Sequence, residues 1–342
     1  MKKTLTTLLS LALSVTTTAQ TADYADYTAH EWGTFTSVSS SDGYLLDGLY
    51  LEEEKLPRFV HEFGGVRPIN MKMSSNGPKP RVHVEGVNIK METPVIYFYS
   101  DVEREVSVDV DFNGGIISQW YPQVRKPNRM PELCRKGDSW ANLSFLHTES
   151  LDFRHHYQDK ITWDLKVLSP DTFKSYTSPQ DQETATWINP RFVDANLLDV
   201  KGQRERYLFY RGLARFNTPL TITAQSEQQI TLSSPDDISF ALVYEYSGAG
   251  KGKVWWTGAV KGGDNVVVKK KSHDVDQAIN GDFLKGLVDA GLYEKEAKSM
   301  LETWRHSYFD KPGLRVFWVV PRKFTDEILP IKFKPSPKNL ER

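Results

Sequence analysis

The chain has a single cysteine, Cys134, among 342 residues, and this scarcity excludes an intrachain disulfide. Cys134 is also far from the N-terminus, so it cannot be the lipid-bearing first residue of a processed lipoprotein. Without a covalent cross-link, burial of apolar side chains has to stabilise the folded state. The length is about twice that of a usual domain, which predicts one large unit or two packed ones.

The sequence also lacks an excess of either charge and a long apolar segment in its interior. Lys and Arg number 43 against 44 Asp and Glu, with no basic run, which argues against a nucleic-acid partner. No interior segment is long and apolar enough for a membrane-spanning helix, so we predict no transmembrane anchor. The aromatic content of 12% indicates an ordered chain rather than a disordered one.

The N-terminus has the order of an export signal. Lys2 and Lys3 supply positive charge, the apolar stretch 5–15 follows, and small or polar residues lead to Ala19. We therefore predict a removable signal peptide at 1–19 and a periplasmic or secreted protein. The alternative is a buried N-terminal helix, which the Thr-rich composition disfavours.

Alternation of apolar and polar residues is the main structural signal. Residues 105–112 alternate strictly, which predicts a strand with one dry and one wet face. Asn113-Gly114 follows, and this pair is typical of a tight hairpin turn. Together with the apolar segments 94–100 and 116–121, the pattern predicts an antiparallel meander.

Further short alternating segments without intervening helices predict a mainly β fold with antiparallel, sandwich-like sheets. Helical periodicity comes late, at 283–288 and 293–308, with Gly291 between the two stretches, which predicts a C-terminal helical hairpin. We expect a β-rich domain over 20–275, with the hairpin and final strands of 276–342 packed on the same unit. Residues 169–204 contain three prolines and no sustained period, which predicts a lid, a linker or a boundary between β subdomains.

A His-Glu-aromatic-Gly pattern occurs twice, beginning at His30 and at His61. Adjacent His and Glu side chains point to opposite faces of a strand, so one pair cannot grip one ion. Two histidines from two such elements, with a carboxylate from elsewhere, would make a three-ligand site for a divalent metal. The alternative is that both histidines are polar ends of strands anchored by their aromatic neighbours.

Glu92 and Arg211 are the candidate catalytic residues. Glu92 comes just before the apolar segment 94–100, at the edge of a rigid scaffold. Arg211 follows the aromatic segment 207–210, where its guanidinium could bind a carboxylate or phosphate group. The alternative for each is a structural ion pair.

Trp255 and Trp256 are consecutive, so on a regular strand one would face the core and the other the solvent. An outward tryptophan offers a flat apolar face on which a sugar ring could stack, which makes the pair a candidate ligand-binding site. The alternative is a large aromatic core.

Four short stretches are distinctive in composition: HEWGTFTSV (30–38), METPVIYFY (91–99), FYRGLARF (209–216) and GLYEKEAKSMLETW (291–304). They resemble motifs of a family of exported bacterial proteins with no established activity. The resemblance covers most of the chain and implies one integrated unit rather than two exchangeable modules. It carries over no catalytic residue.

Three functions remain open on the sequence. The first is an enzyme that acts on an envelope or extracellular polymer, with metal assistance and with His30, His61 and Glu92 near its site. The second is a glycan-binding module that uses Trp255 or Trp256. The third is a structural envelope protein. The irregular segment 169–204 favours a protein that has a site.

Overall fold

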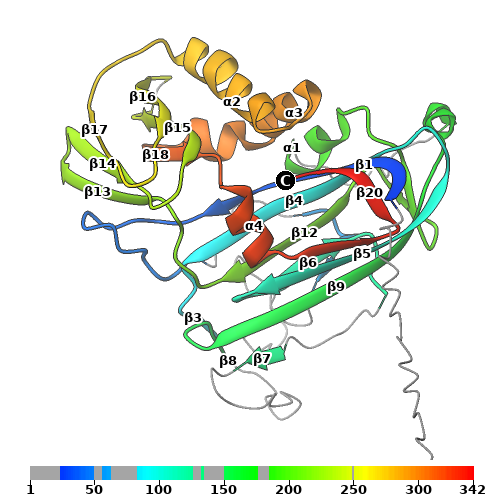
Figure 1. The fold of residues 1–342 in the computed structure, drawn as a ribbon. Coiled ribbons are helices and arrows are strands. Elements are labelled where there is room, and N and C mark those ends of the chain that lie inside the picture. Colours follow the sequence, from blue (N-terminus) through cyan, green and yellow to red (C-terminus); the bar gives the residue numbers. More distant parts are fainter. Residues whose placement is uncertain are drawn as a thin grey trace, which may run out of the picture.

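The computed structural model describes residues 24–49, 56–62, 83–125, 132–134, 150–175, 185–248 and 250–342. The predicted signal peptide at 1–19 lies outside these residues. The described chain is mainly strand, arranged in several largely antiparallel sheets with a few helices towards the C-terminus, as predicted (Figure 1). No described helix combines the length and the apolar character needed to span a membrane.

Two sheets face each other in the larger of two β sandwiches. The first sheet has the order β2-β6-β12-β4-β1-β20, and the second has the order β11-β10-β9-β5-β19, with β7 added beside β9. The strands of the first sheet are β1 (Tyr24–Thr36), β2 (His61–Glu62), β4 (Ile89–Tyr99), β6 (Gly115–Tyr121), β12 (Leu208–Ala214) and β20 (Ser336–Glu341). Those of the second are β5 (Arg104–Asn113), β7 (Glu132–Cys134), β9 (His156–Val167), β10 (Leu198–Val200), β11 (Gln203–Glu205) and β19 (Ile331–Lys334).

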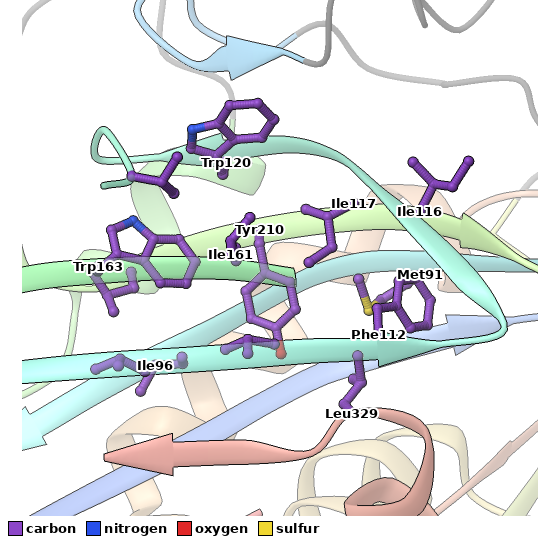
Figure 2. Packing of buried hydrophobic residues seen from close by; sticks show 14 of the residues in the cluster. Met91, Ile96, Phe112, Ile116, Ile117, Trp120, Ile161, Trp163, Tyr210 and Leu329 are labelled. Carbon is purple, nitrogen blue, oxygen red and sulfur yellow. The ribbon is translucent and has the colours of Figure 1, made fainter. Parts of the chain in front are cut away.

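The main hydrophobic core fills the space between these two sheets. Figure 2 shows part of it, where Trp163 of β9 packs near Tyr210 of β12 and Phe112 of β5 lies beside Met91 of β4. The predicted alternation holds in β5, whose apolar side chains are buried while their neighbours face outward. In β6, by contrast, every residue is buried, because both faces of the first sheet are covered.

The predicted meander around Asn113-Gly114 is wrong. The turn exists, with Gly114 at a φ of 81°, but β5 pairs in the second sheet and β6 in the first. Where the chain crosses between the sheets, the Phe112 ring lies directly on Gly115 and leaves no room for a Cβ there. Local turn chemistry therefore predicted the reversal but not the partner of each strand.

A smaller sandwich follows in the chain. One sheet has the order β13-β14-β17, the other has the order β16-β15-β18, and a separate core cluster lies between them. Their strands are β13 (Thr221–Ser226), β14 (Gln229–Ser233), β15 (Ile238–Tyr246), β16 (Gly252–Val260), β17 (Asn265–Lys269) and β18 (Gly313–Trp318). Apart from both sandwiches, β3 (His83–Glu85) pairs with β8 (Ser150–Asp152).

The predicted helical hairpin is present, along the upper side of the molecule in Figure 1, and packs against both sandwiches. Gly291, at a φ of 114°, separates its two arms, as expected for a glycine that ends a helix. Leu292 and Met300 contact both the outer face of the first sheet and the helix-covered face of the smaller sandwich. The hairpin consists of η4 (Gln277–Phe283), α2 (Leu284–Asp289), α3 (Glu294–Trp304) and η5 (Arg305–Phe309).

The described part of 169–204 belongs to the larger sandwich and does not divide the chain. It contains η2 (Pro170–Ser175), α1 (Ala185–Ile188), η3 (Asn189–Arg191) and two strands of the second sheet. The change of sandwich comes later, between β12 and β13. After α3 the chain adds one strand to each of three sheets: β18 pairs with β15, β19 with β5 and β20 with β1. The helix α4 (Arg322–Ile328) lies between β18 and β19 in the chain.

Two phenylalanines should contribute very differently to the stability of the fold, because one is buried in the core and the other is exposed. Phe112 is 0% exposed and Phe192 is 66% exposed. Phe112→Ala should lower the free energy of unfolding by roughly 3 to 5 kcal/mol, because it leaves a cavity between the sheets. Phe192→Ala, the matched control, should change it by no more than about 0.5 kcal/mol. Urea denaturation measures both, and equal effects would contradict the burial of Phe112 between the two sheets.

Candidate functional site

The first His-Glu-aromatic-Gly motif lies on β1 and places its side chains on opposite faces of the first sheet. His30 and Trp32 face outward, towards the helices, and Trp32 packs in an aromatic cluster there. Glu31 faces the core and accepts a hydrogen bond from Tyr210. Gly33 allows the backbone of β1 to approach Pro94 of β4 closely, since a Cβ at Gly33 would lie 2.7 Å from the Cα of Pro94. The pattern thus builds a polar position on each face.

A buried carboxylate holds His30. Nδ1 of His30 lies 2.8 Å from Oε2 of Glu296, a residue of α3, and the two residues are 3% and 0% exposed. Glu296 also accepts the backbone N–H of Tyr293, at the start of α3, and the hydroxyl of Tyr99 at 2.5 Å. Glu296 therefore caps α3 and orients the imidazole at once.

His30 also lines an open cavity of about 280 Å³. Within the described chain, Nε2 of His30 makes no hydrogen bond. The cavity lies where β1 and β20 meet the turn between α2 and α3. Its lining is mostly polar and consists of Thr28, His30, Asp289, Ala290, Gly291, Tyr293, Asn339 and Glu341.

Glu341 is the direct neighbour of His30 across the parallel β1–β20 pair. Paired residues of a parallel ladder project to the same face, so both side chains enter the cavity. The carboxylate lies against Gly291, where an added Cβ would be 2.8 Å from Oε2. Among the described residues, no cation or hydrogen-bond donor engages this carboxylate. An imidazole and an unpaired carboxylate thus share one cavity.

His61 lies elsewhere and does not complete this site. Its ring packs near the rings of Trp120 and Tyr121, and Nε2 is 3.4 Å from Oε1 of Gln203. Three strands separate β2 from β1 in the sheet, which places His61 about 19 Å from His30 across the strands. The prediction that the two histidines share one metal ion is therefore wrong. Over the described ranges, no three His, Cys, Asp or Glu side chains are grouped as a metal site would require.

Glu92 is buried on the same outer face, at the far end of β4. Its Oε1 pairs with Nζ of Lys90 at 2.5 Å, and its Oε2 accepts the Tyr308 hydroxyl at 3.0 Å. Tyr308 also hydrogen-bonds Thr36 of β1. Both carboxylate oxygens of Glu92 thus have partners, and the hydrogen bond to Tyr308 connects η5 to the first sheet.

Arg211 lies on β12, next to β4, and is 6% exposed. Its Nε donates to Oε1 of Gln119 on β6 at 2.5 Å. Glu92 and Arg211 thus lie on neighbouring strands and face the same side of the sheet. Neither lines the cavity at His30.

The two tryptophans do not alternate as predicted. A bulge in β16 places Trp255 between the paired residues Val254 and Trp256, so both rings pack against the core of the smaller sandwich. Trp255 is 2% exposed and donates from Nε1 to Glu245. Trp256 is partly buried, with its ring on Gly258. The exposed aromatic at the cavity is instead Tyr293, at 47%.

Sequence reasoning found His30 but missed its partners, Glu296, Glu341 and Tyr99. Glu296 is hidden among several charged residues of a helical segment, and only its place three residues after Tyr293 fits a capping position. Glu341 carries no local signal, because the parallel pairing of the last strand with the first brings it to His30.

Comparison with protein-family models, with curated proteins and with solved structures finds no match to this chain. The resemblance to an exported bacterial family therefore stays a prediction.

Removal of the Glu296 carboxylate should destabilise the protein strongly. Glu296→Ala leaves one buried donor and two partly buried donors without an acceptor and should lower the free energy of unfolding by roughly 3 to 5 kcal/mol. Glu296→Gln keeps an acceptor and should cost less. Glu294→Ala, on the exposed side of the same helix, is the control and should leave the stability nearly unchanged. If Glu294→Ala proved as costly as Glu296→Ala in urea denaturation, the assigned contacts would be wrong.

Alkaline pH should weaken the fold through buried tyrosines. Burial, together with the adjacent Glu296 carboxylate, holds the pKa of Tyr99 well above its ordinary value, and burial raises the pKa of Tyr121 to about 12. Above about pH 10 the unfolded chain releases these protons while the folded chain keeps them. The free energy of unfolding is therefore unaffected below that pH and falls above it, by about 1.4 kcal/mol per pH unit for each such tyrosine.

Tyr99→Phe removes one of these groups. Between about pH 10 and pH 11.5, its stability should fall less steeply than that of the wild type, by about 1.4 kcal/mol per pH unit. Urea denaturation at a series of pH values measures the slope. Tyr121→Phe should flatten the slope in the same way, but only up to about pH 12. A Tyr99→Phe slope equal to that of the wild type would contradict the burial of this hydroxyl.

Proposed function

We propose that the protein is an exported enzyme that hydrolyses an envelope or extracellular polymer, with His30 as the group that transfers the proton. One observation carries the proposal: a fully buried carboxylate orients His30 through Nδ1, and Nε2 is left without a partner at the wall of a cavity. A histidine held by a carboxylate on one nitrogen and open on the other is suited to general acid–base catalysis.

The contacts support a simple sequence of proton transfers. Glu296 accepts a hydrogen bond from Nδ1–H of His30, and in this tautomer Nε2 is the basic nitrogen towards the cavity. Nε2 takes a proton from water, while the water oxygen forms a bond to the scissile carbon of the polymer. The bond from that carbon to the leaving atom then breaks, and His30 returns the proton to that atom. Glu296 stabilises the transient imidazolium.

The cost of burial favours an enzyme over a structural protein. Burying an ionisable pair is expensive, and an apolar contact would hold α3 on the sheet as well or better. A glycan-binding module without catalysis is the alternative, because Tyr293 offers an exposed aromatic face in the same cavity. Such a module would not need the open nitrogen of His30.

The test is release of soluble fragments from purified cell-wall sacculi and from extracellular polysaccharides, followed by chromatography. His30→Asn keeps a donor for Glu296 but has no atom at the place of Nε2, so it should fold and should release fragments about 100-fold to 10,000-fold more slowly. Glu296→Gln should also slow release, by a smaller factor. His306→Asn is the matched control, since His306 is exposed and lies beside Asp310.

Two results would overturn the proposal. One is fragment release by His30→Asn at the wild-type rate. The other is the absence of fragments from every polymer with the wild-type protein, which would favour the glycan-binding alternative.

A further inference from the structure

A second cavity adjoins the first and extends the site along α2. It measures about 260 Å³ and shares Asp289 and Ala290 with the cavity at His30. Its other lining residues come from β15, β16 and the first arm of the hairpin: Ser239, Phe240, Thr257, Gly258, Asp282, Lys285 and Gly286. Because the two cavities share these residues, a chain molecule that occupied one cavity would extend into the other.

Carboxylates dominate the two cavities. Glu341 and Asp289 line the first, and Asp282 lines the second together with Asp289. Lys285 is the one lysine or arginine among the described lining residues, and Asp289 pairs with it. Asp282 accepts hydrogen bonds from Thr257 and Gln277 but has no cationic partner in the described chain. Each cavity thus keeps one carboxylate that no cation balances.

A separate observation indicates that the first cavity holds a ligand. His30 is 97% buried, as its 3% exposure shows, and its Nε2 nonetheless has no hydrogen-bond partner within the described residues and lies at the cavity wall. Nε2 is not among the fully buried side-chain atoms of the described residues that lack a partner, so it is open to the cavity and accessible to a group that arrives from outside. Glu341 lies beside it on the next strand.

The chemistry of the lining defines the ligand. An uncompensated carboxylate in a partly enclosed site attracts an ammonium group. The half-exposed ring of Tyr293 offers a flat apolar face suited to a sugar ring, and Thr28 and Asn339 offer hydrogen-bonding groups for hydroxyls. A peptide amine would use the carboxylate but not the aromatic face, so the combination favours a sugar.

We propose that the two cavities bind consecutive residues of a polysaccharide that contains free amino sugars, with one ammonium group at Glu341 beside His30 and the next near Asp282. Binding itself needs no catalysis, and the inference rests on the proposed function only for the hydrolytic step, in which His30 would act next to the bound amino sugar. Glu341 is the residue that sets specificity, and it does not transfer the proton.

Binding of two matched oligosaccharides tests the proposal by calorimetry at low salt. Chitosan pentamer carries free amines, and chitin pentamer has the same backbone with each amine acetylated. The chitosan oligomer should bind at least tenfold more tightly, and added salt should reduce the difference because salt screens exposed charges. Oligolysine of similar charge should bind more weakly than chitosan, because it has no ring to stack.

Glu341→Gln should weaken chitosan binding about tenfold without affecting the fold, since the carboxylate has no partner among the described residues. Asp264→Asn is the matched control: it removes one negative charge in the exposed turn between β16 and β17 and should bind as the wild type does. His30→Asn should weaken chitosan binding less than Glu341→Gln does, while it loses fragment release.

The outcomes separate the two proposals. Equal affinity for both pentamers, tighter binding of oligolysine, or unchanged affinity in Glu341→Gln would overturn the amino-sugar site, whatever the fragment assay shows. Selective chitosan binding with wild-type fragment release by His30→Asn would support the amino-sugar site and overturn the catalytic role of His30.

Discussion

The hydrogen bonds of Glu296 are the contact on which the arrangement of the molecule depends. This one carboxylate caps α3, receives the Tyr99 hydroxyl from β4 and holds His30 of β1. Through it the helical hairpin is joined to the first sheet, while the apolar side of the hairpin packs on the smaller sandwich. A loss of this contact would therefore loosen both the candidate site and the junction between the sandwiches.

A second polar network lies on the opposite face of β1 and brings the last strand into place. Glu31 accepts the Tyr210 hydroxyl and pairs with Arg342, whose side chain is only 1% exposed and also reaches Asp326 of α4. These contacts hold β20 against β1 in a parallel pair. Since Glu341 precedes Arg342, the same network that anchors the strand in the core sets Glu341 beside His30.

Strand periodicity predicted much of the fold, and its failures share a cause. Alternation identified β5, and helical periodicity with Gly291 identified the hairpin. Asn113-Gly114 predicted a reversal correctly but the wrong pairing, and the β16 bulge placed Trp255 and Trp256 on the same core. Periodicity records whether a side chain is buried, but it does not record which sheet a strand joins.

By itself, the sequence determined the mainly β fold class and the opposite orientation of His30 and Glu31 on a strand. These follow from local sterics and the two-residue period of a strand. Only the tertiary structure decided which groups meet that histidine. It separated His30 from His61 by three strands, and it joined His30 to Glu296 and Glu341, which are far away in the chain. The physical reason is that pairing between distant strands and helix docking depend on the shape and burial of the whole core, which no local pattern of residues contains.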